Sequence, residues 1–302
     1  MLNQHKDRRS QQQEEADNEA EKAISMGQVA QGAAAYDHNT ERESTRAVRD
    51  PYHSLEFMVT WHFLQQLLPP TGLVLDAGGG LGRYALELCR AGYEVVLLHP
   101  SPRLVSLARE TFAMEPYAVQ RRLLGSAIGD VQDLSMLKGD HFDAVLCLGG
   151  LLTHIGSSTG RDKALSELVR VARPGALVAI SVMGYLAMLR AILVLFSDDL
   201  LDPSLQALVS SGDTASATDT IRHFFRADEL RQQAESAGLT TIQMVGCEGL
   251  STGLAEATNA LGQDAAKWAQ WTQIVNRTCT EPAVVDMAEH ILYLGRKAER
   301  RA

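Results

Sequence analysis

After Pro70 the hydrophobic positions along the chain form a repeating pattern of two kinds of segment. Short runs rich in Val, Ile and Leu alternate with segments whose apolar residues recur with the period of a helix. This alternation is typical of βαβ units and favours a doubly wound, mostly parallel α/β sheet of seven strands. The pattern predicts strands near 73–76, 94–98, 124–128, 142–147, 176–182, 240–245 and 289–295, with helices near 82–91, 102–112, 161–172 and 226–237.

The segments outside this alternation divide the chain further. The first thirty residues carry many charged and amide side chains and few large apolar ones, which is typical of a disordered tail. A helical pattern follows Pro51 and ends before Pro69. We therefore expect a disordered tail over 1–30, an N-terminal helical extension or lid over 31–70, the α/β core over 71–183, a cap insertion over 184–222, and the rest of the core over 223–302 with a helical insertion near 248–286.

One apolar run, residues 177–196, is about as long as a membrane span. Gly184 divides the run and Arg190 lies in its second half, while its first half has the Val and Ile content of a buried parallel strand. The run therefore predicts a core strand followed by an apolar helix, and no membrane partner is expected.

Composition and net charge argue against several classes of partner and binding site. The 302 residues carry a formal net charge of −9, which disfavours nucleic acid as a partner because the overall field repels phosphates. The four cysteines are far apart and show no metal-ligand spacing, so neither a metal site nor a disulfide framework is predicted. The N-terminal residues lack the apolar core of a signal peptide, and we expect a cytoplasmic protein that acts on a small molecule; no oligomeric state is predicted.

A glycine-rich turn is the strongest chemical signal in the sequence. The apolar run Leu73–Leu75 leads into Asp76 and then into four glycines within the five positions 78–82, and good helix formers follow. A strand, a glycine turn and a helix in that order present free backbone N–H groups at the carboxyl edge of a sheet. A nicotinamide dinucleotide is one of two cofactor classes that fit such a turn. Its binding sites carry an acidic residue about 20 residues later, whereas the second predicted strand of this chain ends in His99.

The turn resembles the DxGxGxG motif of the class I S-adenosylmethionine-dependent methyltransferases, and further segments in the same order resemble other motifs of that family. His99–Arg103 is similar to the start of its second helix, and Ile128–Leu134 to its GDxxDL segment. Phe142–Leu148 resembles its fourth strand, and Leu168–Ala176 its approach to the fifth. The resemblance implies the seven-stranded fold of this family and S-adenosylmethionine as cofactor.

The resemblance also assigns roles to residues. The glycines would let the methionine and ribose ends of the cofactor lie against the backbone, Asp76 would fix the loop and the cofactor's amino group, and Asp130 would bind adenine with the Val131 N–H. The cofactor-binding residues implied in this way are Asp76, Gly78, Gly80, Gly82, His99, Asp130, Val131 and Leu148. His99 departs from the family, which normally has Asp or Glu there to accept from the ribose hydroxyls, and the difference is worth about 1–2 kcal/mol of binding.

The acceptor should lie over the loops that follow the fourth and fifth strands. His154 is the first candidate for a general base if the acceptor is a hydroxyl, although a loop histidine bonded to backbone is the commoner case. Methyl transfer from a sulfonium needs mainly in-line positioning in a dry pocket, so a catalytic side chain is not required. The candidates for the substrate pocket are Tyr36, His53, His154, Tyr185 and His223.

These patterns favour a methyltransferase that acts on a small molecule, with the methylated atom left open. Two alternatives remain at this stage. One is a non-catalytic cofactor-binding or scaffolding protein, which the unusual His99 keeps open, and the other is a nicotinamide-dependent oxidoreductase, which the missing acid disfavours.

Overall fold

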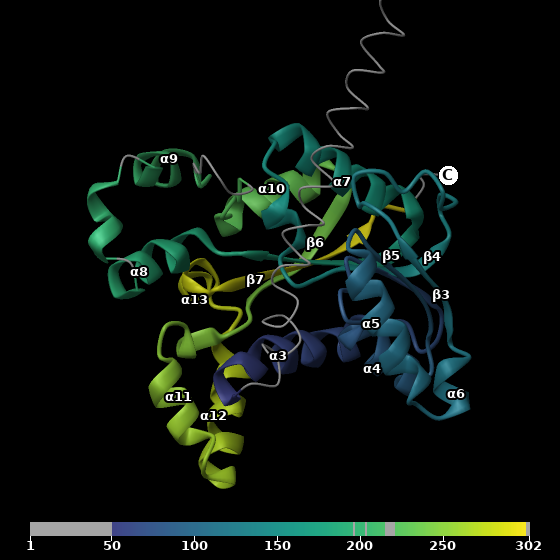
Figure 1. The fold of residues 1–302 in the computed structure, drawn as a ribbon, viewed down its shortest axis with the longest axis horizontal. Helices are drawn as coiled ribbons and strands as arrows, with labels where there is room; N and C mark the ends of the chain where they lie inside the picture. The colour runs from purple at the N-terminus through teal and green to yellow at the C-terminus, as the bar shows by residue number, and fades with distance from the viewer. Residues whose placement is uncertain (1–49, 196, 203, 215–220, 300–302) are drawn as a thin grey trace, which may run out of the picture.

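The computed structural model describes residues 50–195, 197–202, 204–214 and 221–299. Its centre is a seven-stranded sheet in the order β3-β2-β1-β4-β5-β7-β6 (Figure 1). Among the described strands, β7 alone runs in the direction opposite to the other six. The strands are β1 (Leu73–Ala77), β2 (Glu94–His99), β3 (Leu123–Ile128), β4 (Phe142–Cys147), β5 (Ala172–Met183), β6 (Leu239–Gly246) and β7 (His290–Lys297). The predicted fold class is thereby confirmed.

Helices cover both faces of the sheet, and the core is correspondingly split in two. Apolar side chains of α7, α10 and α13 pack on one face, and those of α3, α4, α5 and α12 pack on the other. The helices are α3 (Pro51–Leu67), α4 (Arg83–Ala91), α5 (Pro102–Ala113), α6 (Tyr117–Gln120), α7 (Ser158–Val171), α8 (Tyr185–Leu195), α9 (Ser204–Ser211), α10 (Ala227–Ser236), α11 (Ala255–Leu261), α12 (Ala265–Thr278) and α13 (Pro282–Met287), with short 3₁₀ turns η1 (Leu151–His154), η2 (Ser197–Leu201) and η3 (Gly249–Ser251).

The central strands read as continuous apolar runs because both of their faces are buried. In β4, Ala144 and Leu146 face the α4 side while Val145 and Cys147 face the α7 side, and all four are fully buried. Helix starts are set by local caps. The Ser101 hydroxyl accepts from the Leu104 N–H at 3.1 Å, directly after β2 ends. Strand ends and helix starts therefore meet at one edge of the sheet.

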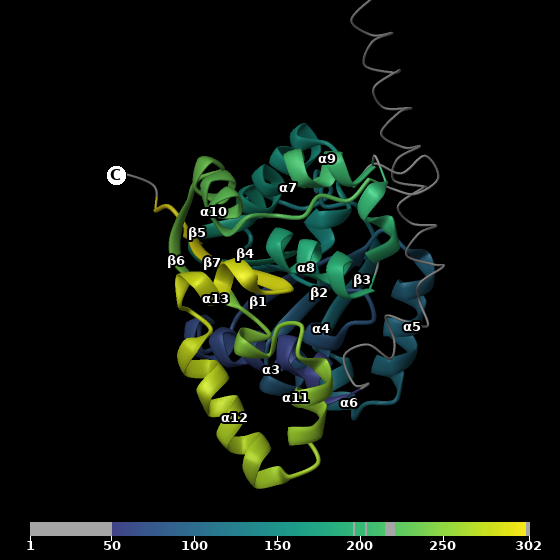
Figure 2. The same ribbon diagram turned by 90° about the vertical axis from the view of Figure 1, so that its left-hand side faces the viewer.

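This carboxyl edge is surrounded by the segments that interrupt the βαβ pattern. Figure 2 looks onto it and shows α3, α8, α11 and α13 placed around the ends of β1 and β4. The segment predicted as a cap contains α8, η2 and α9, and the one predicted near 248–286 contains η3, α11, α12 and α13. The tail predicted over 1–30 lies outside the described residues.

The apolar run 177–196 divides into β5 and α8. Gly184 separates them, and a Cβ at Gly184 would lie 2.1 Å from the Ala288 carbonyl oxygen, so only glycine fits. Within the described part of the chain, no helix is both long and apolar enough to cross a membrane.

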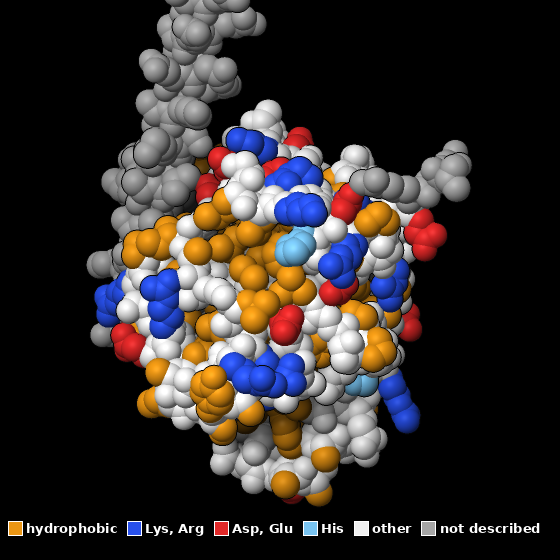
Figure 3. Space-filling view, turned by 90° about the vertical axis from the view of Figure 1, so that its right-hand side faces the viewer, with side chains coloured by type: hydrophobic (Ala, Val, Ile, Leu, Met, Phe, Trp, Pro, Cys, Tyr) orange, Lys and Arg blue, Asp and Glu red, His pale blue; other side chains and the backbone are white. Residues whose placement is uncertain are grey.

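The opposite, amino edge of the sheet is closed by ion pairs. Lys297, at the end of β7, pairs with Asp140 at 2.7 Å, and Arg173 pairs with Asp143 at the start of β4. Figure 3 views this side of the molecule and shows apolar side chains across the middle, bordered by Lys and Arg side chains. None of the predicted site residues belongs to these pairs.

Candidate functional site

The glycine turn after β1 is held to β2 by its backbone. The N–H groups of Gly78 and Gly79 both donate to the Leu98 carbonyl, at 2.7 and 3.1 Å. A Cβ at Gly78 would lie 2.5 Å from Leu151 Cδ2, so this glycine is required by the protein's own packing. Gly80 also has a positive φ, +53°, but a Cβ there would meet no described atom within 4 Å. Gly80 therefore faces open space, as a position for the close approach of a ligand does.

Asp76 lies beneath this turn. Its side chain is fully buried, and neither carboxylate oxygen has a hydrogen-bond partner of regular geometry among the described residues. Burial raises the Asp76 pKa to about 7, while the Ala85 backbone N–H lowers it slightly. A carboxylate with this environment is a ready partner for a cationic group brought in by a ligand.

His99 ends β2 and is 3% exposed. Its Nδ1 accepts from the Ser101 N–H at 3.0 Å, which places the proton of a neutral ring on Nε2. His99 would then donate to a ribose oxygen, whereas a carboxylate at this position would accept from the ribose hydroxyls. The sequence could not show this, because the tautomer depends on the turn that follows the strand.

Asp130 and Val131 lie beyond the end of β3. Asp130 is partly buried, and its Oδ1 accepts from the Gln132 backbone N–H at 2.9 Å. Burial raises the Asp130 pKa and the hydrogen bonds from Gln132 lower it, with a net rise. Val131 is 3% exposed and packs in the core on the α7 side, which anchors the loop.

The loop after β4 completes the edge of the predicted cofactor site. Leu148 is buried, and the Gly149 N–H donates to the Ser181 hydroxyl of β5 at 2.8 Å. Gly149 has a φ of +73°, and a Cβ there would meet no atom within 4 Å. Gly80 and Gly149 thus both open toward unfilled space at adjacent strand ends, since β1 pairs with β4.

Two of the predicted pocket residues, His154 and Tyr185, lie in different elements of the cap side. His154 ends η1, and its neighbour Thr153 accepts from the Met183 N–H at 3.0 Å, which fixes the loop against β5. Tyr185 is 4% exposed and donates to the Val209 carbonyl at 2.8 Å. Tyr185 therefore holds α8 to α9.

His223 is taken up by two carboxylates. Its Nδ1 lies 2.7 Å from Asp213 and its Nε2 lies 2.7 Å from Glu229, and the ring is 3% exposed. Burial tends to raise the Glu229 pKa, but its hydrogen bond to His223 and the charge of that ring lower it overall. With both nitrogens engaged, His223 serves as a structural clamp between the end of the cap and α10.

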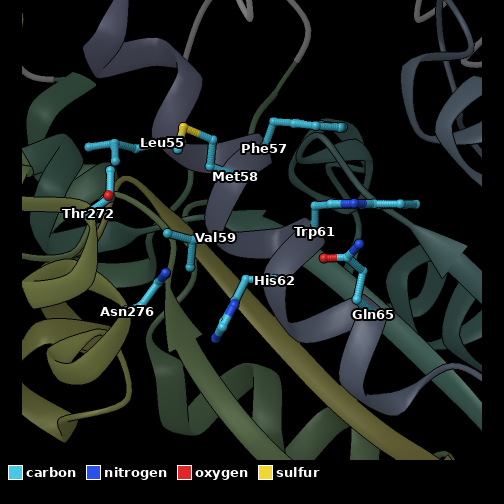
Figure 4. Close-up of a pocket in the computed structure, with 9 residues that line it drawn as sticks. All are labelled: Leu55, Phe57, Met58, Val59, Trp61, His62, Gln65, Thr272 and Asn276. Atoms are coloured by element: carbon cyan, nitrogen blue, oxygen red, sulfur yellow. The ribbon is translucent and has the colours of Figure 1, made fainter. Parts of the chain in front are cut away.

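The N-terminal candidates lie at the start of α3 or outside the described residues. His53 Nδ1 lies 2.7 Å from Asp50, which caps the helix. Tyr36 lies outside the residues that the structure describes. The helix itself borders a shallow pocket of about 300 Å³, shared with α12 and lined by Leu55, Phe57, Met58, Val59, Trp61, His62, Gln65, Thr272 and Asn276 (Figure 4). None of the predicted site residues lines it.

A buried polar cluster near the start of β7 was missed by sequence reasoning. The Tyr52 hydroxyl donates to Glu289 at 2.5 Å, and His290 Nδ1 lies 2.6 Å from Glu248. Burial tends to raise the Glu248 pKa, but the charge and hydrogen bonds of His290 lower it overall. Ligand atoms of Glu248, Glu289 and His290 lie within 4.8 Å of one another, so the group could hold a cation. No sequence motif indicates this cluster, because Tyr52, Glu248 and the pair Glu289–His290 lie far apart in the sequence.

Comparison with known proteins identifies the core. Residues 75–180, which run from β1 through β5 and contain the glycine turn, match a family model described as a methyltransferase domain. Over these residues the chain is similar to the methyltransferase domain family. The sheet order with its reversed β7 also differs from the 3-2-1-4-5-6 order of the nicotinamide-binding fold, so the oxidoreductase alternative finds no support.

The methyltransferase domain has a curated relative with a named substrate. A glycine/sarcosine N-methyltransferase of Aphanothece halophytica is 28% identical over 112 residues, which cover 37% of this chain and 40% of that protein. The chain therefore spans about two fifths of the length of this relative.

Two solved structures are similar over most of the chain. An S-adenosylmethionine-dependent methyltransferase from Methanosarcina mazei has a TM-score of 0.55 at 19% identity and covers 79% of this chain and 98% of its own. A structure described as a [4+2]-cyclase has a TM-score of 0.52 at 15% identity, with 81% and 82% covered. At these identities the likeness concerns the fold alone.

The residues present fit the cofactor of this family. The buried carboxylate of Asp76, which has no regular hydrogen bond within the described part of the chain, and the open sides of Gly80 and Gly149 lie at the ends of β1 and β4. Asp130 lies beyond β3, two strands away, which matches an elongated nucleoside ligand that follows the carboxyl edge.

Proposed function

We propose that this protein binds S-adenosylmethionine along the carboxyl edge of β1, β2 and β3 and transfers its methyl group to the nitrogen of a small amine. The observation that supports this most is the match of residues 75–180 to the methyltransferase domain family, together with relatives named for N-methylation of glycine and sarcosine. The geometry of the glycine turn is compatible with this use.

The chain's own residues would bind and orient. The open side of Gly80 admits the ligand to the backbone, and Asp76 offers a buried negative charge to a cationic amino group. His99 donates from Nε2 toward the ribose, and Asp130 accepts from the adenine amino group. When bound, the cofactor supplies a methyl group on an already activated sulfonium, so the protein's main task is to align the acceptor and to exclude water.

The fold alone does not decide between methyl transfer and another use of the same site. A [4+2]-cyclase shares this fold, and function resides in the site rather than in the architecture. The non-catalytic reading is therefore retained as an outcome of the test.

The test combines binding with turnover. Calorimetry should detect binding of S-adenosylhomocysteine and no binding of NAD. S-adenosylhomocysteine at a hundredfold its Kd should stabilise the fold by about 2.7 kcal/mol. Radiolabelled methyl transfer is then measured with amines, glycine and sarcosine included, beside matched alcohols. Binding without transfer to any amine would support the non-catalytic reading, and absence of binding would reject the proposal.

A further inference from the structure

Two clusters in the described part of the chain each combine one imidazole with two carboxylates. One joins the end of the cap to α10, and the other lies at the carboxyl edge, where β6 ends and β7 begins. Their members are Asp213, His223 and Glu229 in the first cluster, and Glu248, Glu289 and His290 in the second. Because both clusters offer the same kinds of ligand atom, any difference in what they bind must come from geometry and charge.

The side chains of the first cluster diverge. His223 has a carboxylate 2.7 Å from each ring nitrogen, Asp213 at Nδ1 and Glu229 at Nε2. The two nitrogens of an imidazole point in different directions, so these carboxylates lie on different sides of the ring. An ion bound to one ring nitrogen is therefore out of reach of the carboxylate on the other side.

The side chains of the second cluster converge. One ligand atom each of Glu248, Glu289 and His290 lies within 4.8 Å of the other two. The bonds of a zinc-type ion to nitrogen and oxygen are about 2.1 Å long, so ligand atoms on opposite sides of the ion are about 4.2 Å apart. Small side-chain rotations are therefore enough to bring all three atoms to one ion.

The second cluster also carries more negative than positive charge. Glu248 is 2% exposed, His290 is 6% exposed and Glu289 is half-buried. Two carboxylates and one imidazole leave at least one negative charge even when the ring is protonated. No described Lys or Arg forms an ion pair with either carboxylate, and the guanidinium of the nearby Arg190 lies against Gly253 instead. A buried charge without a counter-charge is costly, so the cluster favours a cation from outside the chain.

Backbone hydrogen bonds hold the three side chains in place. The His290 N–H donates to Glu248 Oε2 at 3.0 Å, and the Cys247 N–H donates to the His290 carbonyl at 2.9 Å, which joins the end of β6 to the start of β7. The Gly184 N–H donates to the Glu289 carbonyl at 2.8 Å. A site whose backbone is fixed before binding loses little conformational freedom when an ion enters.

Tyr52 orients one of the carboxylates without belonging to the ligand set. Its hydroxyl accepts from the Gly253 N–H at 3.0 Å and donates to Glu289 at 2.5 Å. Hydrogen-bond partners of this kind orient metal ligands and tune the affinity of a site. The start of α3 is thereby placed beside the cluster.

We propose that Glu248, Glu289 and His290 bind one divalent transition-metal ion, of which Zn²⁺ is the representative. An imidazole nitrogen combined with carboxylate oxygens suits zinc-type ions, whereas Mg²⁺ and Ca²⁺ prefer oxygen ligands alone. The bound ion neutralises the excess charge of the cluster, and three protein ligands leave a fourth position open for water or a small ligand. The site lies at β6 and β7, away from the glycine turn of β1, so the ion binds without the cofactor.

The test titrates Zn²⁺ into the full chain after treatment with a chelator and removal of the chelator. The wild type should bind one equivalent, and His290→Gln and Glu289→Gln should each weaken that binding about a hundredfold or more. Co²⁺ provides a second readout, because its visible absorption reports the ligands around it. The Co²⁺ spectrum of the wild type should be absent from both variants, and Mg²⁺ should not displace the ion.

The divergent cluster provides the matched controls. His223→Gln and Glu229→Gln make the same substitutions there and should keep the Zn²⁺ affinity within about twofold of wild type. Circular dichroism of the metal-free variants checks that each is folded. Glu289→Gln is the mildest change, because its side chain is half-buried and an amide replaces a carboxylate of the same shape. Tyr52→Phe should weaken Zn²⁺ binding about tenfold without abolishing it.

Three outcomes would overturn the proposal. One is the absence of Zn²⁺ binding, or equal affinity in wild type, His290→Gln and Glu289→Gln. Another is an equal loss in the variants of both clusters, which would attribute the loss to a general disturbance of the fold and not to removal of ligands. The third is displacement of Zn²⁺ by an equal concentration of Mg²⁺, which would remove the imidazole from the ligand set and with it the transition-metal class.

Discussion

Two parts of the carboxyl edge differ in how their residues come together. We call the ends of β1 to β4 the cofactor half, and the ends of β5 and β7 with Tyr52 the acceptor half. In the cofactor half, Asp76 lies near the end of β1, Gly80 follows that strand and His99 ends β2, and the glycine turn is fixed by backbone hydrogen bonds to the adjacent strand. In the acceptor half, Tyr52 and Glu289 meet across 237 positions of sequence. The first half depends on local backbone geometry and the second on distant side chains.

The halves also differ in how charge is compensated. The Asp76 carboxylate is buried without a regular partner, whereas Glu248 and Glu289 are each bonded to a neighbouring side chain. The free carboxylate oxygens of Asp76 match the cationic amino group of the proposed cofactor, whereas the carboxylates of the acceptor half are bonded to the protein's own side chains.

The largest expected effect distinguishes two causes of lost cofactor affinity: a side chain that fills the open side of the glycine turn, and strain in the backbone. Gly80→Leu should weaken S-adenosylhomocysteine binding about a hundredfold or more, because the new side chain occupies the open side of the turn. Gly92→Leu is the matched control, since Gly92 also has a positive φ, +104°, and open space at its Cβ, but it caps the far end of α4. Equal loss of affinity in both variants would show that backbone strain, and not the open space beside Gly80, decides binding.

The next test acts on the acceptor half. Tyr52→Phe removes the hydroxyl between Gly253 and Glu289, leaves the half-buried Glu289 carboxylate with one partner fewer, and should lower the free energy of unfolding by about 2 kcal/mol. Denaturant titration measures this loss. Calorimetry should find the S-adenosylhomocysteine affinity within about twofold of wild type. A large loss of that affinity would contradict the division into two halves.

Asp76 gives a pH dependence whose sign follows from its raised pKa. Between the ordinary value of 3.8 and about 7 the folded state binds the extra proton, so this group lowers stability as pH rises through that window. Asp76→Asn should therefore melt at a higher temperature than wild type at about pH 8 and lose that advantage below about pH 4. The same variant should bind S-adenosylhomocysteine about tenfold more weakly, and unchanged affinity would remove Asp76 from the cofactor site.

The smallest effect concerns His99. A carboxylate at this position can accept from both the Ser101 N–H and a ribose hydroxyl, so His99→Asp should tighten S-adenosylhomocysteine binding about fivefold. Calorimetry against adenine, which lacks the ribose, provides the control. Weaker binding in the variant would show that the Nε2–H donor is the better partner for the ribose.

The sequence by itself determined the strands and the glycine turn of the cofactor half. Hydrophobic alternation located the strands, and the glycines between Asp76 and Gly82 marked the turn, because steric limits on the backbone act within a few residues. These signals can be found in the sequence without any knowledge of tertiary contacts.

Only the tertiary structure decided which side chains face one another. It bonded His223 to two carboxylates, set the ring proton of His99, and brought Tyr52 and Glu289 together. Hydrogen bonds and ion pairs act over a few ångströms in space regardless of separation along the chain. Their partners are therefore fixed by packing of the whole fold, which no local pattern of residues records.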